Sequence, residues 1–317
     1  MLTRQVLFMI FAFIVSFAFT FATTPLVRRF AFKIGAIDIP KDNRRMHKKP
    51  TPRIGGLAII FGFTVATLCF AQPSRQLYGT LAGAAIIAVM GVIDDCKNLP
   101  AKLKFVIQII AALVVVFAGD IKIDVFTNPN FLSDNPYWVL PEWLSVTLTV
   151  IWIVFITNAV NFIDGLDGLA AGVSAIMSIS LVFISIRVGE YPIAILGIAL
   201  MGSCFGFLPF NFNPAKIFMG DTGSLFLGAS VALMAIDLKM PIHLILIGFV
   251  YFMETLSVIM QTAYFKYTKK KYGEGRRIFK MSPIHHHFEM CGWKEKKIVA
   301  VFTLVTVITC AVAYFAI

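Results

Sequence analysis

Five aspartates in this sequence have the types and spacing needed to handle phosphates and metal ions. Asp94 and Asp95 are adjacent, Asp164 and Asp167 are three residues apart, and Asp221 lies in the string GDTGS. Adjacent carboxylates repel each other unless a cation or a proton compensates. Mg²⁺ binds through one or two carboxylates and completes its shell with water and phosphate oxygens. The aspartates therefore predict a cation and phosphate site, with a solvated helix end as the alternative for the adjacent pair.

A polar residue recurs at every third position in TNAVNFIDGLDGLAAG, namely Asn158, Asn161, Asp164 and Asp167. On a helix this spacing places the four side chains along one stripe. A glycine follows each aspartate, which permits a close backbone approach or a break in the helix. Two amides and two acids are too costly to face lipid, so the stripe is expected to face protein, water or a ligand. A helix cap with incidental acids is the alternative.

The segment around Asp221 is predicted to form the centre of the site. Asp221 or Thr222 can simply cap the apolar helix that follows, but an aspartate at a loop tip beside a diphosphate also suits a Mg²⁺ ligand. Lys104, ten residues after Asp94, enters the next apolar segment and is expected to face the same cavity. Asp94 is the candidate if the reaction uses a general base. Phe218 can stack on the nucleobase of a nucleotide, although a lone aromatic residue also serves as packing.

Three consecutive histidines, His285, His286 and His287, precede the last apolar segment. Neighbouring side chains on a helix point about 100° apart, which argues against a zinc ion held by all three. Imidazoles that donate hydrogen bonds to diphosphate oxygens fit the sequence better. A solvated interfacial loop is the alternative.

Two other segments carry candidate binding residues. Lys48 or Lys49, beside the Pro-Thr-Pro turn, is suited to a lipid phosphate headgroup. Glu254 and Gln261 are seven residues apart in METLSVIMQ, and this spacing places them on one helix face. We expect these two to be buried partners or part of a pocket wall.

The composition decides which elements must position these residues. Hydrophobic residues make up 58% of the 317 residues and charged residues 14%, which a soluble fold cannot accommodate but a bilayer can. We expect an all-α polytopic membrane protein with one integral-membrane domain over 1–317, because no polar stretch is long enough to fold alone. About ten apolar runs are long enough to cross a bilayer as helices; they lie near 5–27, 54–72, 78–93, 105–119, 144–162, 169–187, 192–210, 223–238, 243–265 and 298–316.

The distribution of the basic residues predicts the orientation. Of the 28 Lys and Arg, 23 fall in the connections 28–53, 94–104, 211–222 and 266–297, and the remaining five are Arg4, Arg75, Lys122, Arg187 and Lys239. Basic loops stay in the cytoplasm, so both termini are expected outside and the aspartates at the cytoplasmic face. The net charge of +11 reflects this topology, and no basic module or motif indicates nucleic acid. The outer connection 120–143 is expected to form a short hairpin, with Trp138 and Trp143 at the headgroup level.

Three strings make the chain resemble the polyprenyl-phosphate N-acetylhexosamine-1-phosphate transferase superfamily over essentially its whole length: the Asp94-Asp95 pair, NFIDGLDGLAAG at 161–172 and FMGDTGSLFLG at 218–228. METLSVIMQ and SPIHHHFEMCGW are similar to the phospho-N-acetylmuramoyl-pentapeptide transferase (MraY) branch. RRMHKKPTPRIGGLAI and DDCKNLPAKLKF are more similar to the N-acetylglucosamine-1-phosphate transferases of the WecA and TagO type.

The resemblance implies a Mg²⁺-dependent enzyme of the bacterial cytoplasmic membrane. It would transfer phospho-MurNAc-pentapeptide from UDP-MurNAc-pentapeptide to undecaprenyl phosphate, giving lipid I and UMP; UDP-GlcNAc is the alternative donor. It also implies ten transmembrane helices with the ninth bent or broken, a homodimer, and a pocket open to tunicamycin-type inhibitors. A secondary transporter is the rival from another class, but transporter sites lie near the midplane, often between related halves. A CDP-alcohol phosphotransferase is a further rival, whose Asp-Gly-Ala-Arg pattern is missing.

The resemblance also assigns roles to individual residues. Asp94 and Asp95 would lie near the lipid phosphate, Asp221 would bind Mg²⁺, and Asp167 would contact the uridine. The predicted catalytic residues are Asp94, Asp95, Asp221 and His285. The predicted substrate-binding residues are Lys49, Lys104, Asn161, Asp164, Asp167, Asn211, Phe218, Gln261, His286 and His287.

Overall fold

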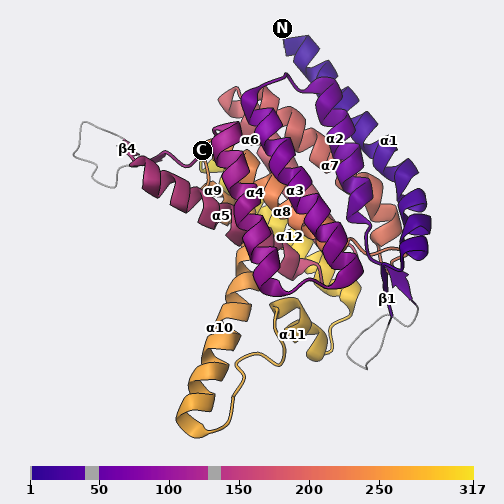
Figure 1. The fold of residues 1–317 in the computed structure, drawn as a ribbon, viewed down its shortest axis with the longest axis vertical. Coiled ribbons are helices and arrows are strands. Elements are labelled where there is room, and N and C mark those ends of the chain that lie inside the picture. The colour runs from indigo at the N-terminus through magenta and orange to yellow at the C-terminus, as the bar shows by residue number, and fades with distance from the viewer. Residues whose placement is uncertain (1, 40–49, 128–136) are drawn as a thin grey trace.

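The computed structural model describes residues 2–39, 50–127 and 137–317 of the chain. This part contains twelve helices and two short antiparallel sheets (Figure 1). The helices are α1 (Leu2–Ile34), α2 (Gly56–Phe70), α3 (Arg75–Lys97), α4 (Ala101–Gly119), α5 (Glu142–Ile163), α6 (Leu169–Val188), α7 (Tyr191–Asn211), α8 (Gly220–Asp237), α9 (His243–Ile247), α10 (Phe249–Tyr272), α11 (Ile284–Met290) and α12 (Glu295–Phe315). The strands are β1 (Ile37–Asp38), β2 (Thr51–Pro52), β3 (Val125–Thr127) and β4 (Tyr137–Val139).

Each of the ten apolar runs expected from the sequence contains a helix. Helices satisfy their own backbone hydrogen bonds, which is why an apolar chain in lipid folds in this way. Within the described residues, seven helices are long and apolar enough to cross a membrane, namely α1, α3, α4, α5, α6, α7 and α12. Helix α2 is a shorter apolar helix of 15 residues. The protein is thus a helical, polytopic membrane protein.

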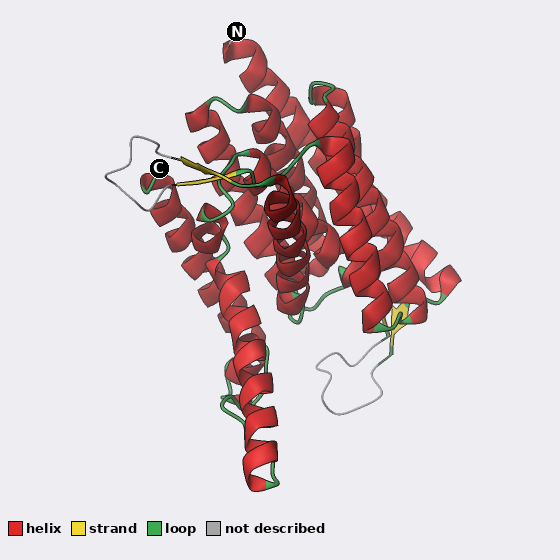
Figure 2. Cartoon of the chain, turned by 60° about the vertical axis from the view of Figure 1, so that its left-hand side comes forward, coloured by secondary structure: helices red, strands yellow, loops and turns green. Residues whose placement is uncertain are grey.

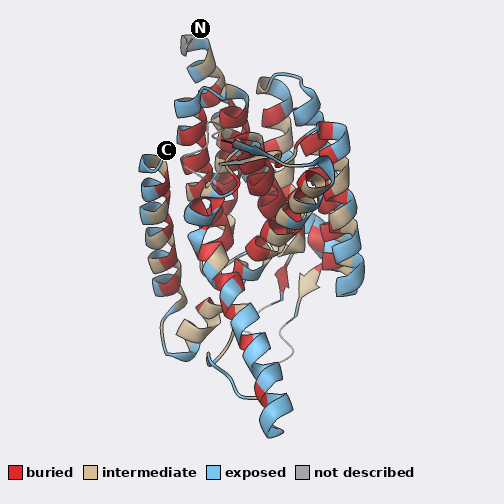
Figure 3. Ribbon diagram, turned by 90° about the vertical axis from the view of Figure 1, so that its left-hand side faces the viewer, coloured by how far each residue is buried: buried red, intermediate tan, exposed pale blue. Residues whose placement is uncertain are grey.

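Helix α8 lies in the middle of the bundle and packs against α2, α3 and α5. All its residues from 222 to 236 are buried (Figure 3). Glycines let the neighbouring backbones approach closely: a Cβ on Gly91 of α3 would lie 2.5 Å from the Cα of Thr222. A Cβ on Gly228 would lie 2.7 Å from the Cα of Thr157 in α5. These crossings bring the first turn of α8 beside the ends of α3 and α5.

The ninth apolar run is broken at Gly248, between α9 and α10. The Gly248 N–H still donates to the Leu244 carbonyl oxygen at 2.7 Å, so the break redirects the chain without leaving this donor unpaired. Helix α10 then leaves the bundle, and its last turns extend beyond the other helices (Figure 2). The break that the resemblance implies is confirmed.

The two sheets mark the two ends of the bundle (Figure 1). Strands β3 and β4 form the hairpin expected in 120–143, with Val125 opposite Val139, and lie toward the end where both termini are found. Trp138 and Trp143 are 55% and 70% exposed, as the expected headgroup anchors should be. Strands β1 and β2 lie at the opposite end, together with α11 and the tip of α10.

Candidate active site

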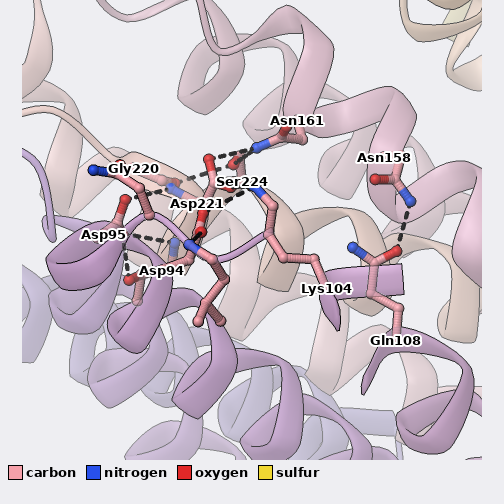
Figure 4. A network of polar contacts seen from close by, with 12 residues as sticks. Asp94, Asp95, Lys104, Gln108, Asn158, Asn161, Gly220, Asp221 and Ser224 are labelled. Carbon is pink, nitrogen blue, oxygen red and sulfur yellow. Dashed lines mark hydrogen bonds and ion pairs between the residues drawn. The ribbon is translucent and has the colours of Figure 1, made fainter. Parts of the chain in front are cut away.

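One lysine and two aspartates from three helices meet at the end of the bundle that carries β1 and α11. The Lys104 Nζ of α4 donates to Asp94 Oδ2 of α3 at 3.0 Å and to Asp221 Oδ2 of α8 at 2.9 Å (Figure 4). Asn161 of α5 donates to Asp221 Oδ1 at 3.0 Å and to the Ser224 hydroxyl at 2.9 Å. The structure therefore brings together four predicted site residues, and Ser224 joins them although sequence reasoning did not single it out.

Asp95 faces away from Lys104 and caps helix α8. Its carboxylate accepts the backbone N–H of Asp221 at 3.1 Å, the backbone N–H of Thr222 at 3.0 Å and the Thr222 hydroxyl at 2.6 Å. A carboxylate on the unpaired N–H groups of a helix start satisfies them and matches the helix dipole. Gly220 has a φ of +72°, and a Cβ there would lie 2.5 Å from Asp95 Oδ2. Asp95 thus positions Asp221 through the backbone.

The turn between α3 and α4 fixes Asp94. Asp94 Oδ1 accepts the N–H of Leu99 at 2.7 Å, across a left-handed Asn98. Arg53 braces the same turn, because its Nε donates to the Asp95 carbonyl oxygen and its Nη2 to Asn98 Oδ1, both at 2.8 Å. The sequence signal for Arg53 was only its membership of a basic loop, so its contribution was missed.

The predicted polar stripe faces protein. Asn158 Nδ2 donates to Gln108 Oε1 of α4 at 2.6 Å, one turn along α4 from Lys104, and Asn161 points to Asp221 (Figure 4). Asp164 follows at the end of α5. Burial and then the negative charges of Asp221, Asp95 and Asp167 raise the pKa of Asp164 to about 8. The aspartates beside Asp164 therefore outnumber the one lysine, Lys104, that bonds Asp94 and Asp221.

Asp167 organises the connection between α7 and α8. Its Oδ2 accepts the Ala215 N–H at 2.8 Å and the Asn213 side-chain N–H at 3.2 Å. Its own backbone N–H donates to Glu295 Oε1 of α12 at 2.7 Å, and Asn213 donates to Glu295 Oε2 at 2.5 Å. Neither Asn213 nor Glu295 was predicted, because nothing in their local sequence indicates that they meet.

Three predicted binding residues hold backbone in place. Asn211 accepts the Gly168 N–H at 3.1 Å and donates to the Ile217 carbonyl oxygen at 3.0 Å. The Gln261 amide bonds the backbone of Ile278 and Phe279, with each of its three hydrogen bonds at 3.0 Å. The backbone of Phe218 pairs with Pro52 and Gly55 at the entrance to α2. Lys48 and Lys49 lie outside the described residues.

The three histidines of α11 have three different partners. His285 and Glu254 of α10 are both fully buried, and His285 Nδ1 lies 3.1 Å from Glu254 Oε1. His286 Nδ1 lies 2.6 Å from Glu289 Oε2, and His287 Nδ1 accepts the Lys280 N–H at 3.1 Å. Glu254 is therefore the buried partner that its spacing allowed.

His285 joins α11 to the loop that follows α5. Its Nε2 is buried and has no hydrogen-bond partner among the described residues. A Cβ on Gly165 would lie 2.3 Å from this atom, so the ring lies directly against the Asp164–Asp167 loop. Among the predicted catalytic residues, Asp94 and Asp221 share Lys104, Asp95 supports them, and His285 supports the neighbouring loop.

The donor set around Lys104 is compatible with Mg²⁺. Among the described residues, no group of three His, Cys, Asp or Glu side chains is arranged as a ready-made metal site. Mg²⁺ does not require one, because it takes one or two carboxylates with waters and phosphate oxygens. The Asp221 side chain is 25% exposed and the Asp94 side chain 8%, so Asp221 is the more accessible of the two carboxylates that contact Lys104.

Comparison with known proteins gives the class. The model of the family described as Glycosyl transferase family 4 matches residues 77–239, and the chain belongs to this family. It is thus an enzyme of the polyprenyl-phosphate sugar-1-phosphate transferase type and a multi-pass protein of the bacterial cytoplasmic membrane.

The relatives divide between two named activities. The chain is 38% identical to the phospho-N-acetylmuramoyl-pentapeptide-transferase of Caldicellulosiruptor bescii, over 96% of each chain. It is 37% identical to the protein of the same name from Clostridium perfringens, over 98% of each chain. It is 44% identical to a probable undecaprenyl-phosphate N-acetylglucosaminyl 1-phosphate transferase of Bacillus subtilis, over 74% of this chain and 64% of that protein.

Proposed function

We propose that this protein transfers phospho-MurNAc-pentapeptide from UDP-MurNAc-pentapeptide to undecaprenyl phosphate, releasing UMP and forming lipid I. The observation that carries the proposal is the cluster of Asp94, Lys104, Asn161 and Asp221. Relatives named for this activity match the chain over nearly their full length, which favours this donor. UDP-GlcNAc is the second candidate, because the Bacillus subtilis relative has higher identity over a shorter stretch.

We propose that the ten apolar segments cross the membrane as one domain, with both termini outside and the cluster at the cytoplasmic face. The support is the excess of Lys and Arg in the connections at the cluster's end of the bundle. This placement suits the reaction, because the nucleotide sugar is in water and the polyprenyl phosphate is confined to lipid. A homodimer is carried over from the resemblance.

The cluster of Asp94, Lys104, Asn161 and Asp221, which we call the acidic centre, offers a binding place for Mg²⁺ in this function. Asp221 is the proposed ligand, because its carboxylate is the more exposed of the two beside Lys104. When bound, Mg²⁺ would neutralise charge on the diphosphate of the donor. Asp95 and Asn161 hold the Asp221 backbone and side chain, so little reorganisation is needed at the site.

The reaction itself is a phosphoryl transfer that needs alignment more than acid–base chemistry. A phosphate oxygen of undecaprenyl phosphate attacks the sugar-linked phosphorus, the bond from that phosphorus to the bridging oxygen breaks, and UMP leaves with the electron pair. The attacking phosphate monoester is largely ionised at neutral pH, so a base is not required. Lys104 can donate to phosphate oxygens in exchange for its contacts with Asp94 and Asp221. Asp94 is the candidate if a base takes part.

The prenyl chain requires an apolar path that reaches this cluster. A hollow of about 350 Å³ on α3 and α4 is lined by Ala85, Ile86, Val89, Met90, Ile93 and Ile107. All six are apolar, and Ile93 directly precedes Asp94. We place the first isoprene units there, with the phosphate at the cluster.

The decisive experiment is UMP release by the purified protein with undecaprenyl phosphate and each donor, with and without Mg²⁺. We expect release from UDP-MurNAc-pentapeptide, no release from UDP-GlcNAc, and loss of release when EDTA removes the metal. If UMP were released with UDP-GlcNAc and not with UDP-MurNAc-pentapeptide, UDP-GlcNAc would be the donor. Undiminished release in EDTA would reject the metal.

A further inference from the structure

A strongly basic surface lies at the end of α10, away from the acidic cluster. It consists of Lys266, Lys269, Lys270, Lys271, Arg276 and Arg277, and we call it the basic tip. All six side chains are exposed, and Glu274 is the one acidic residue between positions 266 and 277. Within the described part of the chain, no ion pair involves any of the six. The proposed reaction uses none of them.

The basic tip continues an exposed apolar stripe along α10. Phe249, Met253, Leu256, Met260, Tyr264 and Tyr267 are each at least 38% exposed. Their separations of three and four residues place them on one helix face. The part from Phe249 to Tyr264 is about 22 Å long, at 1.5 Å per residue. Much of α10 is exposed where it leaves the bundle (Figure 3), and in a membrane protein such an exposed apolar face is expected to contact lipid tails.

Aromatic rings and cations meet where the stripe ends. Lys271 Nζ lies 5.6 Å from the centre of the Tyr267 ring and 5.2 Å from that of Tyr272. The Arg276 guanidinium lies 4.8 Å from the centre of the Tyr272 ring. Tyrosines favour the level of the lipid headgroups, and lysines beside them extend their charge to the same level. The stripe and the rings therefore place the cations at headgroup height.

The basic tip is a folded structure rather than a loose tail. The Arg276 backbone N–H donates to the Thr268 hydroxyl of α10 at 2.8 Å. Gly275 packs against Phe265 so closely that a Cβ would lie 2.3 Å from the ring. Gln261 then binds the backbone of Ile278 and Phe279, just before α11. A contact that holds the basic tip therefore acts on the segment that leads into α11.

We propose that the basic tip docks on anionic phospholipid headgroups and so holds α11 at the membrane surface. A cluster of basic residues next to a membrane segment attracts anionic lipid headgroups. An acidic protein would match the charge but not the adjoining apolar and tyrosine-lined stripe. The proposal depends on the membrane location of the chain and not on which sugar it transfers.

The test is a titration of the full-length, detergent-purified protein with fluorescent phosphatidylglycerol. Changing Lys270, Arg276 and Arg277 together to Gln should weaken binding at least tenfold, and 0.5 M NaCl should weaken parent binding strongly. The matched control changes Arg28, Arg29 and Lys33 to Gln, which removes the same charge from other exposed residues on the cluster's side of the proposed membrane. Its loss of affinity should be several-fold smaller than that of the triple variant. Fluorescent phosphatidylcholine should bind the parent at least tenfold more weakly.

A second variant keeps the proposal testable if the triple variant fails to fold. Glu274→Lys should tighten phosphatidylglycerol binding at least threefold, because it removes the one acid of the basic tip. The proposal is overturned if either variant binds like the parent or if the control loses as much affinity as the triple variant. It is also overturned if millimolar inorganic phosphate displaces the lipid, or if polyglutamate binds more tightly than phosphatidylglycerol.

Discussion

Two adjacent aspartates of α3 perform different tasks because neighbouring helix positions point about 100° apart. Asp94 accepts a hydrogen bond from the Lys104 ammonium, and Asp95 accepts hydrogen bonds from the first N–H groups of α8. The same contrast separates Asp221, which faces the cluster, from Thr222, which is fully buried. A motif of consecutive residues can thus supply one group for chemistry and one for support.

Removing the Asp95 carboxylate should loosen the start of α8. Asp95→Ala leaves buried N–H groups unpaired, at a cost of about 1–3 kcal/mol for each unsatisfied group. We expect a melting temperature lowered by several degrees together with a loss of transfer activity. Asp94→Asn should lose activity with little change in melting temperature. Equal stability of Asp95→Ala and the parent would contradict the capping role.

The raised pKa of Asp164 predicts a dependence of stability on pH. Its value of about 8 lies above 3.8, the ordinary value for Asp, so the folded protein holds this proton more tightly than the unfolded chain does. Stability should therefore fall as the pH rises from about 4 to about 8. In EDTA, Asp164→Asn should melt a few degrees above the parent at pH 8, and the gap should close near pH 4. Parallel melting curves at every pH would contradict this environment.

At the scale of elements, α11 is anchored on two sides. Glu254 of α10 binds one side of the His285 ring, and Gly165 after α5 touches the other. Helix α11 therefore connects the displaced end of α10 to the loop that carries Asp164 and Asp167. This arrangement links the segment between α10 and α12 to the loop beside the acidic centre.

A single methyl group should disturb this connection. Gly165→Ala would place a Cβ 2.3 Å from His285 Nε2, and Glu254 holds the fully buried ring from its other nitrogen. We expect at least a tenfold lower rate of UMP release and a lower melting temperature. Gly172→Ala is the control, because its Cβ would meet only the Thr303 hydroxyl at 4.0 Å. If both variants behaved alike, the proposed packing would be wrong.

The elements were easier to predict than the contacts between them. Apolar runs bounded by charged connections locate the helices, because a lipid-embedded chain can satisfy its backbone in no other simple way. The partners of Asp95 and Asp167 could not be predicted, since Thr222 and Ala215 are 127 and 48 residues away. Local spacing likewise gave no sign that Gln261 and Asn211 bind backbone, or that Arg53, Gln108 and Glu295 take part.

At the scale of the whole molecule, the proposed topology places the two sheets on opposite sides of the membrane. In a variant whose five free cysteines are replaced, Glu274→Cys should react with an impermeant thiol reagent only in inside-out vesicles. Asp124→Cys, beside the β3–β4 hairpin, should react only in right-side-out vesicles. Labelling of both positions from one side would refute the orientation and the cytoplasmic site.

The most direct test of the acidic centre is chemical rescue at Lys104. In the same cysteine-free protein, Lys104→Cys removes the ammonium between Asp94 and Asp221 and should abolish UMP release. Treatment with 2-aminoethyl methanethiosulfonate rebuilds a lysine-like side chain and should restore a substantial part of the activity. The negatively charged 2-sulfonatoethyl reagent should restore none. Full activity of untreated Lys104→Cys, or equal rescue by both reagents, would contradict a catalytic centre built around this lysine.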